Sequence, residues 1–441
     1  MKKIVIIIGC ALLLILGVFT INSRYEKYEE NKAVAVLKNK IVKIKTVKAE
    51  NDFKDLMPLK NILKDKKIVA MGEATHGTKE FFQMKHRMLK FLVEKMDYNV
   101  FGIEACMSEC MAVNDYVLYG KGEAEQVVKK MGFWTWDTKE VVDMVKWMRE
   151  YNENHTKKVK FYGFDMQSSC TAVEKVQAYL KKVDKEYENK VDSILLEFKD
   201  PKTLHGNNKK LHGNEVKKIM CMFEKNKNEY ISKSSKEEYE LYKQNLKIID
   251  EAYDFFKGNQ SNSQMQTKRD KYMAENIKWI LNFEGQDTKI MVWAHNWHVS
   301  KVADNINNIG ENVKRMGSNL YDMYKDKLYV IGFQFSEGTV TAVDKSINRG
   351  EESVMLKKCT LHAAKKGSIP YILSKVDPLF FIDFKSVNTN KYVKEFISTP
   401  KTCRYVDANF NGEDESYETN ILDQCYDGLI YIDKISNSEL I

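Results

Sequence analysis

Six short apolar runs recur along the chain, separated by longer stretches of mixed polar and apolar residues. Each run is rich in β-branched or aromatic residues and is bounded by turn residues, as is typical of a buried strand. The runs cover 67–72, 99–105, 159–165, 289–294, 328–335 and 428–432. Between the first four runs, apolar residues repeat at helical spacing, most clearly in 81–96 and 141–151. This alternation predicts an α/β fold with a central, mostly parallel sheet flanked by helices.

The stretch from about 171 to 283 lacks strand signals and is rich in Lys, Glu and Asn. Apolar residues recur at helical spacing in 173–180, 191–198 and 237–256. We therefore expect a helical insertion between the third and fourth strands. We expect it to act as a lid over the sheet edge; the alternative is that it covers one flank of the sheet.

An uninterrupted apolar run at 4–19 follows Lys2 and Lys3 at the start of the chain. Lysines before such a run keep the short N-terminus inside and direct the rest of the chain across the membrane. The run approaches the minimum of about 17 residues for a spanning helix, and it also fits the core of a signal peptide. No Ala-x-Ala cleavage site follows. We expect an extracytoplasmic protein anchored in the membrane, or a secreted one if the segment is cleaved.

These patterns divide the chain into a membrane anchor or signal segment at 1–23, a tether at 24–50 and an α/β domain at 51–441. Lysine alternates with Val and Ile in 38–48. This part of the tether either lies near anionic headgroups or is simply solvated. The 441 residues, 43% of them hydrophobic, can bury a full core, and no linker or internal repeat divides the chain.

The net charge of +8 is spread over a mixture of 30% charged residues rather than gathered in a basic stripe. We therefore expect no nucleic-acid partner. Seven cysteines follow Cys10, and none forms a Cys-x-x-Cys pair that would suit a zinc knuckle. Cys403 with Cys425 is the one disulfide pairing we consider. Most of the cysteines are expected to be buried as small apolar residues.

Ionisable residues stand at the C-terminal ends of five of the six predicted strands. They are Glu73 and His76, Glu104, Asp165, His295 and His298, and Glu337, in chain order. Parallel strands deliver their C-terminal ends to one edge of the sheet, where α/β proteins build ligand sites. We therefore expect these side chains to share one cleft beneath the helical insertion.

The stretch 68–82 has the pattern of a strand, a tight turn and a helix. Thr78 is expected to cap the helix that begins near Lys79. His76 then lies beside a helix N-terminus, whose partial positive charge disfavours the imidazolium. A neutral imidazole is what a general base requires. Glu73 can orient this ring or accept a proton itself.

At these residues the chain resembles the erythromycin esterase family, and the resemblance extends over about 52–432. Several separated motifs carry it in the same order, with Tyr426-Asp427-Gly428 resembling the family's closing strand. The other motifs are Gly72-Glu73-x-x-His76, Phe101-Gly-Ile-Glu104, Tyr162-Gly163-Phe-Asp165, 269–276, Trp293-Ala-His295-Asn296-Trp-His298 and Arg315-Met316-Gly317. The resemblance implies hydrolysis of a macrolide lactone ester by water, without metal or other cofactor. It also suggests a role in antibiotic resistance.

The resemblance also implies roles for the matching residues. His76 would be the general base that activates water, and Glu73 and Glu104 would position and polarise the site. His295 and His298 would hold the substrate carbonyl or steady the oxyanion. Lys85 departs from the family's Arg, keeping the charge but losing the planar fork. The residues expected to bind substrate are Lys85, Asp165, Trp293, Arg315 and Glu337.

Two other classes of function remain open. A metallohydrolase would use His76, His295 and His298 with Glu73 or Glu104 as ligands of a divalent ion, although no His-Glu-x-x-His helix is present. A non-catalytic envelope-binding protein could keep the same fold. Retention of all five of these site residues speaks against the binding protein. The metallohydrolase ranks second, because the family that the chain resembles works without metal, so the small-molecule ester or lactone hydrolase is favoured.

Overall fold

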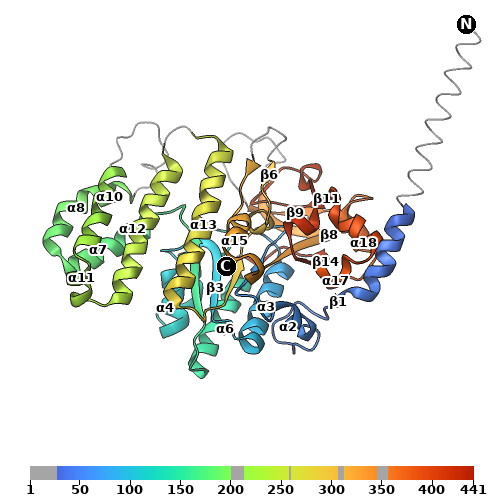
Figure 1. Cartoon of the computed structure of the whole chain (residues 1–441), viewed down its shortest axis with the longest axis horizontal. Helices are drawn as coiled ribbons and strands as arrows, with labels where there is room; N and C mark the ends of the chain where they lie inside the picture. The colour runs from blue at the N-terminus through green and yellow to red at the C-terminus, as the bar shows by residue number, and fades with distance from the viewer. Residues whose placement is uncertain (1–26, 200–212, 258–259, 306–311, 345–355) are drawn as a thin grey trace, which may run out of the picture.

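The computed structural model describes residues 27–199, 213–257, 260–305, 312–344 and 356–441 (Figure 1). All six predicted strands are present, and they lie side by side in one sheet. From one side to the other they are β14 (Gly428–Ile435), β8 (Leu328–Asp344), β2 (Ile68–Met71), β5 (Ile290–Trp293), β3 (Val100–Cys106) and β4 (Lys160–Asp165). Every neighbouring pair among them is parallel. The predicted central parallel sheet is confirmed.

Antiparallel strands extend this sheet on the β14 side and were not predicted. β10 (Leu379–Asp383) pairs with β14, and β1 (Val42–Lys43) pairs with β10. β9 (Leu356–Leu361) pairs antiparallel with the second half of β8, and β12 (Asn409–Phe410) pairs parallel with its end. β8 therefore continues well past the predicted end at residue 335.

Helices cover both faces of the sheet. The chain moves along the sheet in one direction from β2 to β4 and returns through β5 to β8. Right-handed connections therefore put α3 (Lys79–Met96) and α6 (Lys139–Asn154) on one face and α13 (Asn262–Glu284) and α15 (Met316–Tyr324) on the other. The contacts agree, since α3 packs on α6 and α13 packs on α15.

The predicted insertion is helical throughout its described part. Figure 1 shows most of its helices as a group on the left, while α13 lies between this group and α15. The group follows β4, which is the last strand on this side of the sheet. The group consists of α7 (Cys170–Val183), α8 (Lys185–Glu197), α10 (Gly213–Lys225), α11 (Lys227–Lys233) and α12 (Lys236–Phe256). Most of the insertion thus covers a flank, and its role as a lid remains a prediction.

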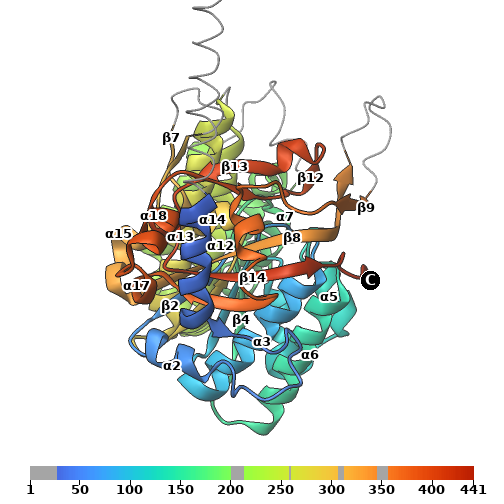
Figure 2. The same ribbon diagram turned by 90° about the vertical axis from the view of Figure 1, so that its right-hand side faces the viewer.

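The segment expected to be a tether belongs to the folded domain from residue 27 onward. Residues 27–40 form a helix that buries Ala33 and Leu37. This helix lies beside α18 (Lys391–Ser398) in Figures 1 and 2, at the edge of the molecule. The alternation within 38–48 belongs to strand β1 and its flanks, with Ile44 turned into the core. The expected domain start at residue 51 is therefore wrong.

The predicted anchor lies outside the described residues. Within the described ranges, no helix is long and apolar enough to cross a membrane. None of the seven cysteines after Cys10, all of them in the described ranges, forms a disulfide, and five of them are buried. The considered pairing of Cys403 with Cys425 is therefore not formed.

Candidate active site

A cleft of about 1,320 Å³ opens at the C-terminal edge of the central strands. The connections that leave β2 and β5 run to opposite faces of the sheet, and such a switch point leaves a crevice between neighbouring strand ends. His76, Glu104, His295 and His298 line this cleft. The prediction that the strand-end residues meet at one edge is confirmed for these four. Other walls come from the loop 133–136, the first turns of α13 and the segment 400–425.

Glu73 and His76 form a hydrogen-bonded pair in the turn after β2. The turn packs so tightly that a Cβ at Gly72 would lie 2.1 Å from Oδ1 of Asn296. Nδ1 of His76 lies 2.7 Å from Oε1 of Glu73. With Nδ1 carrying the proton toward Glu73, the lone pair of Nε2 is left for the cleft.

Glu73 itself lies beneath the cleft and is completely buried. Its Oε2 accepts hydrogen bonds from Nζ of Lys85 and from Nε1 of Trp293, each 2.6 Å long. Burial lowers the pKa of Lys85 to about 8, although the charge of Glu73 opposes this. One carboxylate therefore holds both the His76 ring and a buried ammonium group.

Two expectations about the His76 turn are wrong. Helix α3 begins at Lys79, but the Thr78 side chain makes no capping bond; instead the Lys79 N–H donates to the Ser436 carbonyl, 2.9 Å away. His76 is also not held neutral by the helix terminus. Burial disfavours its imidazolium, but Glu73, Glu104 and Asp407 together act in the opposite direction, and the pKa of His76 is raised.

His295 precedes the short helix α14 (Asn296–Val299) and is neutral. Its Nδ1 accepts the Trp297 N–H at 3.4 Å, so the proton of the neutral ring is on Nε2. Burial and the charge of His76 hold the pKa of His295 well below its usual range. Nε2 is buried and has no hydrogen-bond partner in the described part of the chain. The two rings are 4.9 Å apart between centroids, so His295 can offer an N–H donor beside His76.

His298 lies between two carboxylates and is charged. Its Nδ1 is 2.8 Å from Oδ1 of Asp270, and its Nε2 is 3.2 Å from Oε1 of Glu104. Burial disfavours the charge, but Asp270 and Glu104 raise the pKa of His298 to about 9. Arg269 adds a second cation, donating to Glu104 at 2.7 Å and to Asp165 at 2.8 Å.

Of the five residues expected to bind substrate, Arg315 alone is among those that line the cleft. Lys85 and Trp293 lie beneath Glu73, and Asp165 lies behind Arg269. Glu337 is not at a strand end at all, because β8 continues to Asp344, and it pairs with Lys434 at 2.8 Å. These four residues therefore do not line the cleft, and a direct contact with substrate stays a prediction for them; Lys85, Trp293 and Asp165 support residues of the site.

Three site residues were not assigned a role from the sequence. Arg269 and Asp270 belong to the 269–276 motif on α13, in which Asp270 is buried. Charged residues beside the buried apolar positions of a helix are the signal that could have marked them. Asp407 lies in a loop and faces His76, with Oδ1 3.6 Å from Nε2. No periodic pattern marks a loop residue of this kind.

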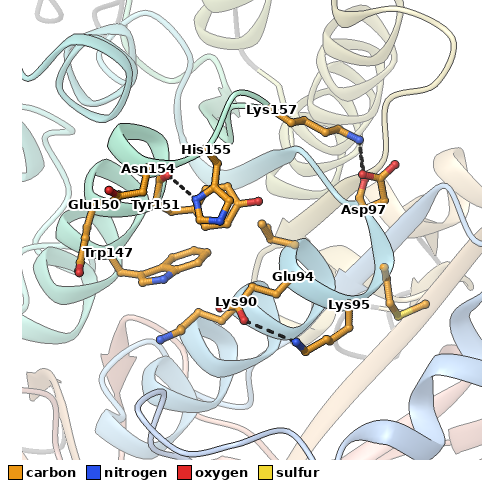
Figure 3. Close-up of a pocket in the computed structure, with 12 residues that line it drawn as sticks. Lys90, Glu94, Lys95, Asp97, Trp147, Glu150, Tyr151, Asn154, His155 and Lys157 are labelled. Atoms are coloured by element: carbon orange, nitrogen blue, oxygen red, sulfur yellow. Dashed lines mark hydrogen bonds and ion pairs between the residues drawn. The ribbon is translucent and has the colours of Figure 1, made fainter.

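A second hollow, of about 800 Å³, lies at the other end of the sheet. The C-terminal ends of α3 and α6 form it, close to where β3 and β4 begin (Figure 3). His155 stacks on Tyr151 there, with ring centroids 3.9 Å apart. None of the predicted site residues lines it.

The donor set of the cleft suits hydrogen bonding better than metal ligation. Nδ1 of His76 is engaged by Glu73, His298 by two carboxylates, and the cation Arg269 lies among them. Within the described ranges, no three His, Cys, Asp or Glu side chains are grouped as metal ligands would be.

A histidine–carboxylate site at the switch point of a parallel sheet places this protein among the α/β proteins that bind a ligand at their strand ends. The chain belongs to the erythromycin esterase family, because that family's sequence model, described as Erythromycin esterase, matches residues 93–435. This match supports the family independently of the Glu73–His76 turn, which precedes the matched residues.

Named relatives and a solved structure agree with this membership. "Putative hydrolase YbfO" of Bacillus subtilis (strain 168) is 29% identical over 428 residues, covering 88% of each chain. "Erythromycin esterase type II" of Escherichia coli is 23% identical and covers 92% of this chain and 98% of its own. A crystal structure of a Bacillus cereus protein has a TM-score of 0.82 at 28% identity, covering 93% of this chain and 99% of its own.

Proposed function

We propose that this protein hydrolyses a carboxylic ester or macrolactone by means of a water molecule that His76 activates, without a metal ion. Membership in the erythromycin esterase family and the names of the relatives support hydrolysis. The observation that carries the mechanism is the pairing of His76 with buried Glu73, beside the neutral ring of His295.

The reaction begins with water at Nε2 of His76. The ring takes one proton while the water oxygen bonds to the ester carbon, and Glu73 stabilises the imidazolium that forms. Nε2–H of His295 donates to the carbonyl oxygen as it gains negative charge. The tetrahedral intermediate then breaks its bond to the alcohol oxygen, which receives the proton from His76. A carboxylic acid and an alcohol leave.

Cations near the cleft floor support the same charge development. His298 and Arg269 are positive, and Glu104 holds both of them. Burial opposes ionisation of Glu104, but the charges of His298 and Arg269 hold its pKa well below the usual range. Fixed charges of this kind need no reorganisation when an oxyanion forms.

The size of the cleft favours a bulky substrate. Its volume of about 1,320 Å³ exceeds the roughly 300–1,000 Å³ of ordinary small-molecule pockets. Trp134 and Trp297 are among its walls, and these partly exposed rings offer apolar surface to a ring or chain of the substrate. A macrolide lactone fits these requirements, so inactivation of such an antibiotic is part of the proposal.

The test is turnover by the full-length chain against a panel of macrolactones and simple esters, with chelator present and absent. The His76→Gln variant is expected to lose 10²–10⁴ in kcat, roughly 3–5 kcal/mol of barrier, with a small change in KM. His155→Gln, in the hollow at the other end of the sheet, is the control and should keep full activity. The proposed mechanism fails if chelation abolishes turnover and zinc or manganese restores it.

We also propose that residues 4–21 hold the chain in the membrane with the enzyme outside the cytoplasm. The support is the apolar run behind Lys2 and Lys3. Cell fractionation tests this, and full-length protein recovered from the cytosol would refute it.

A further inference from the structure

Asp407 faces the ring nitrogen of His76 that Glu73 leaves open. Oδ1 of Asp407 lies 3.6 Å from Nε2 of His76, and 45% of the Asp407 side chain is exposed. Asp407 is also among the residues that line the cleft. It lies between β11 (Lys401–Arg404) and β12. His76 therefore has a carboxylate opposite each of its two nitrogens.

The backbone fixes this position from both sides. The N–H of Val406 donates to the carbonyl of Ala74 at 2.7 Å, which ties the loop to the His76 turn. The N–H of Val343, on β8, donates to the carbonyl of Ala408 at 2.9 Å. The Ala408 N–H also donates to Oδ1 of Asp407 at 2.7 Å. These bonds distinguish Asp407 from an ordinary surface carboxylate.

Nε2 of His76 and Oδ1 of Asp407 are both hydrogen-bond acceptors when His76 is neutral, so a donor between them is needed to bond to both. The neutral ring of His76 offers a lone pair at Nε2, and an ionised carboxylate offers only acceptors. Two acceptors cannot bond to each other, but one water molecule can donate one hydrogen to each. With hydrogen bonds of about 2.8 Å, two such acceptors lie about 4.4 Å apart. The half-exposed Asp407 side chain reaches that spacing by a shift of about 0.8 Å.

We propose that Asp407 is a further catalytic residue, which holds the attacking water together with His76 so that the lone pairs of the water face the ester carbon. This inference rests on the proposed function. One water proton passes to Nε2 of His76 as the oxygen bonds to carbon. The other stays on that oxygen and becomes the acid hydrogen of the product, so no further reactant is needed.

Asp407 also takes part in the electrostatics of His76. The ionisable groups that face this ring are Glu73 from the turn after β2, Glu104 from β3, His295 before α14, and Asp407 from the loop. Burial works against the charged ring, while Glu73, Glu104 and Asp407 all act to raise the pKa of His76. Removal of the Asp407 charge should therefore lower that pKa.

The experiment compares Asp407→Asn with Asp414→Asn in the full-length chain. Asp414 is a matched control, because it is an exposed carboxylate that pairs with Lys365 at 2.8 Å. Asp407→Asn is expected to reduce kcat by about 10–100-fold with KM within about twofold. The acid limb of kcat/KM should also move to lower pH. The control variant should match the wild type in all three quantities.

Three results would overturn the role of Asp407: an unchanged kcat, a loss confined to KM, or a fall in kcat while the acid limb stays in place. The last result would mark a merely structural side chain. An NMR titration of the His76 ring protons gives a readout without substrate, and Asp407→Asn should lower this pKa while Asp414→Asn leaves it unchanged. If the ring pKa moves but no ester is hydrolysed even by the wild type, the proposed function fails while the contact stands. The proposed catalytic role of Asp407 then fails together with the proposed function.

Discussion

Replacing Glu73 by Gln should lower both the free energy of unfolding and the turnover, and a second substitution at Lys85 should restore only the free energy of unfolding. Glu73 accepts hydrogen bonds from Lys85 and Trp293 and also orients His76, and neither Glu73 nor Lys85 has any exposed surface. Glu73→Gln keeps the size of the side chain but leaves the ammonium of Lys85 buried without its anion. The double variant Glu73→Gln/Lys85→Met removes both charges together.

The magnitude follows from the geometry of the pair. Unit charges 2.6 Å apart attract by about 6 kcal/mol at an effective dielectric constant of about 20, and desolvation offsets part of this. Removing one partner of such a pair typically destabilises a protein by about 3–5 kcal/mol. Lys85 can also lose its proton, and keeping a lysine of ordinary pKa 10.5 neutral at pH 7 costs about 5 kcal/mol. The loss of stability caused by the unpaired Lys85 therefore cannot exceed about 5 kcal/mol at pH 7.

The pH dependence has a definite sign. Without Glu73 the pKa of Lys85 falls further below about 8, so the folded variant binds one proton fewer than the unfolded chain. Its stability then rises by about 1.4 kcal/mol between pH 7 and pH 8. The stability of the wild type, whose Lys85 has a pKa of about 8, rises by about 0.4 kcal/mol over the same range, so the deficit should shrink by about 1 kcal/mol. The double variant, with no buried charge, should recover at least about 2 kcal/mol of the loss.

Urea unfolding of the wild type, both single variants and the double variant at pH 7 and pH 8 measures these differences. The exposed pair Glu186 and Lys190 is the control, and its two substitutions should act independently. Strictly additive effects at Glu73 and Lys85 would refute the argument. Turnover should stay about 10²–10⁴-fold low in the double variant as well, because His76 still lacks its carboxylate.

Two further outcomes follow from the buried ionisable groups. The pKa of His76 is raised above its usual 6.5, and kcat/KM should fall tenfold for each pH unit below this raised pKa, because the protonated ring cannot act as a base. A pH profile whose acid limb has its midpoint below pH 6.5 would contradict this. Burial raises the pKa of Glu251 from 4.5 to about 7, so its charge destabilises the fold by up to about 3 kcal/mol above pH 7 and by nothing below pH 4.5. Glu251→Gln should therefore stabilise the protein in urea at pH 8 and not at pH 4.5, and equal effects at both pH values would contradict this.

The central strands could be predicted because they are buried on both faces and are therefore almost continuously apolar. The added strands carry weaker signals. β1 is two residues long, and β9 has two consecutive lysines that an edge strand tolerates. The second half of β8 mixes polar and apolar residues, since its partner changes from β14 to β9. Such long-range pairing is not encoded in any local window.

The site was predictable where it follows from sheet polarity. Residues directly after parallel strands must reach one edge, and four of them line the cleft. Contacts between a strand end and a distant helix or loop have no such rule. Arg269 on α13 reaches Glu104, and Asp407 reaches His76 from a loop over 300 positions away. Glu337 was misplaced because β8 continues past it to Asp344. Lys85 was misplaced because the pattern of α3 does not tell which of its polar side chains is buried.

The three histidines of the cleft differ because their neighbours differ. His76 has a carboxylate at each nitrogen, so its imidazolium is favoured once a proton arrives. His298, clamped by Asp270 and Glu104, is already charged at neutral pH and has no lone pair to offer as a base. His295 accepts a backbone N–H and stays neutral, which makes it a donor through Nε2. Titratable groups of one kind whose pKa values are pushed apart have different acid, base and donor roles. The role of each of these histidines is therefore set by its neighbours, so substitution of those neighbours should change the role even though the histidine is kept.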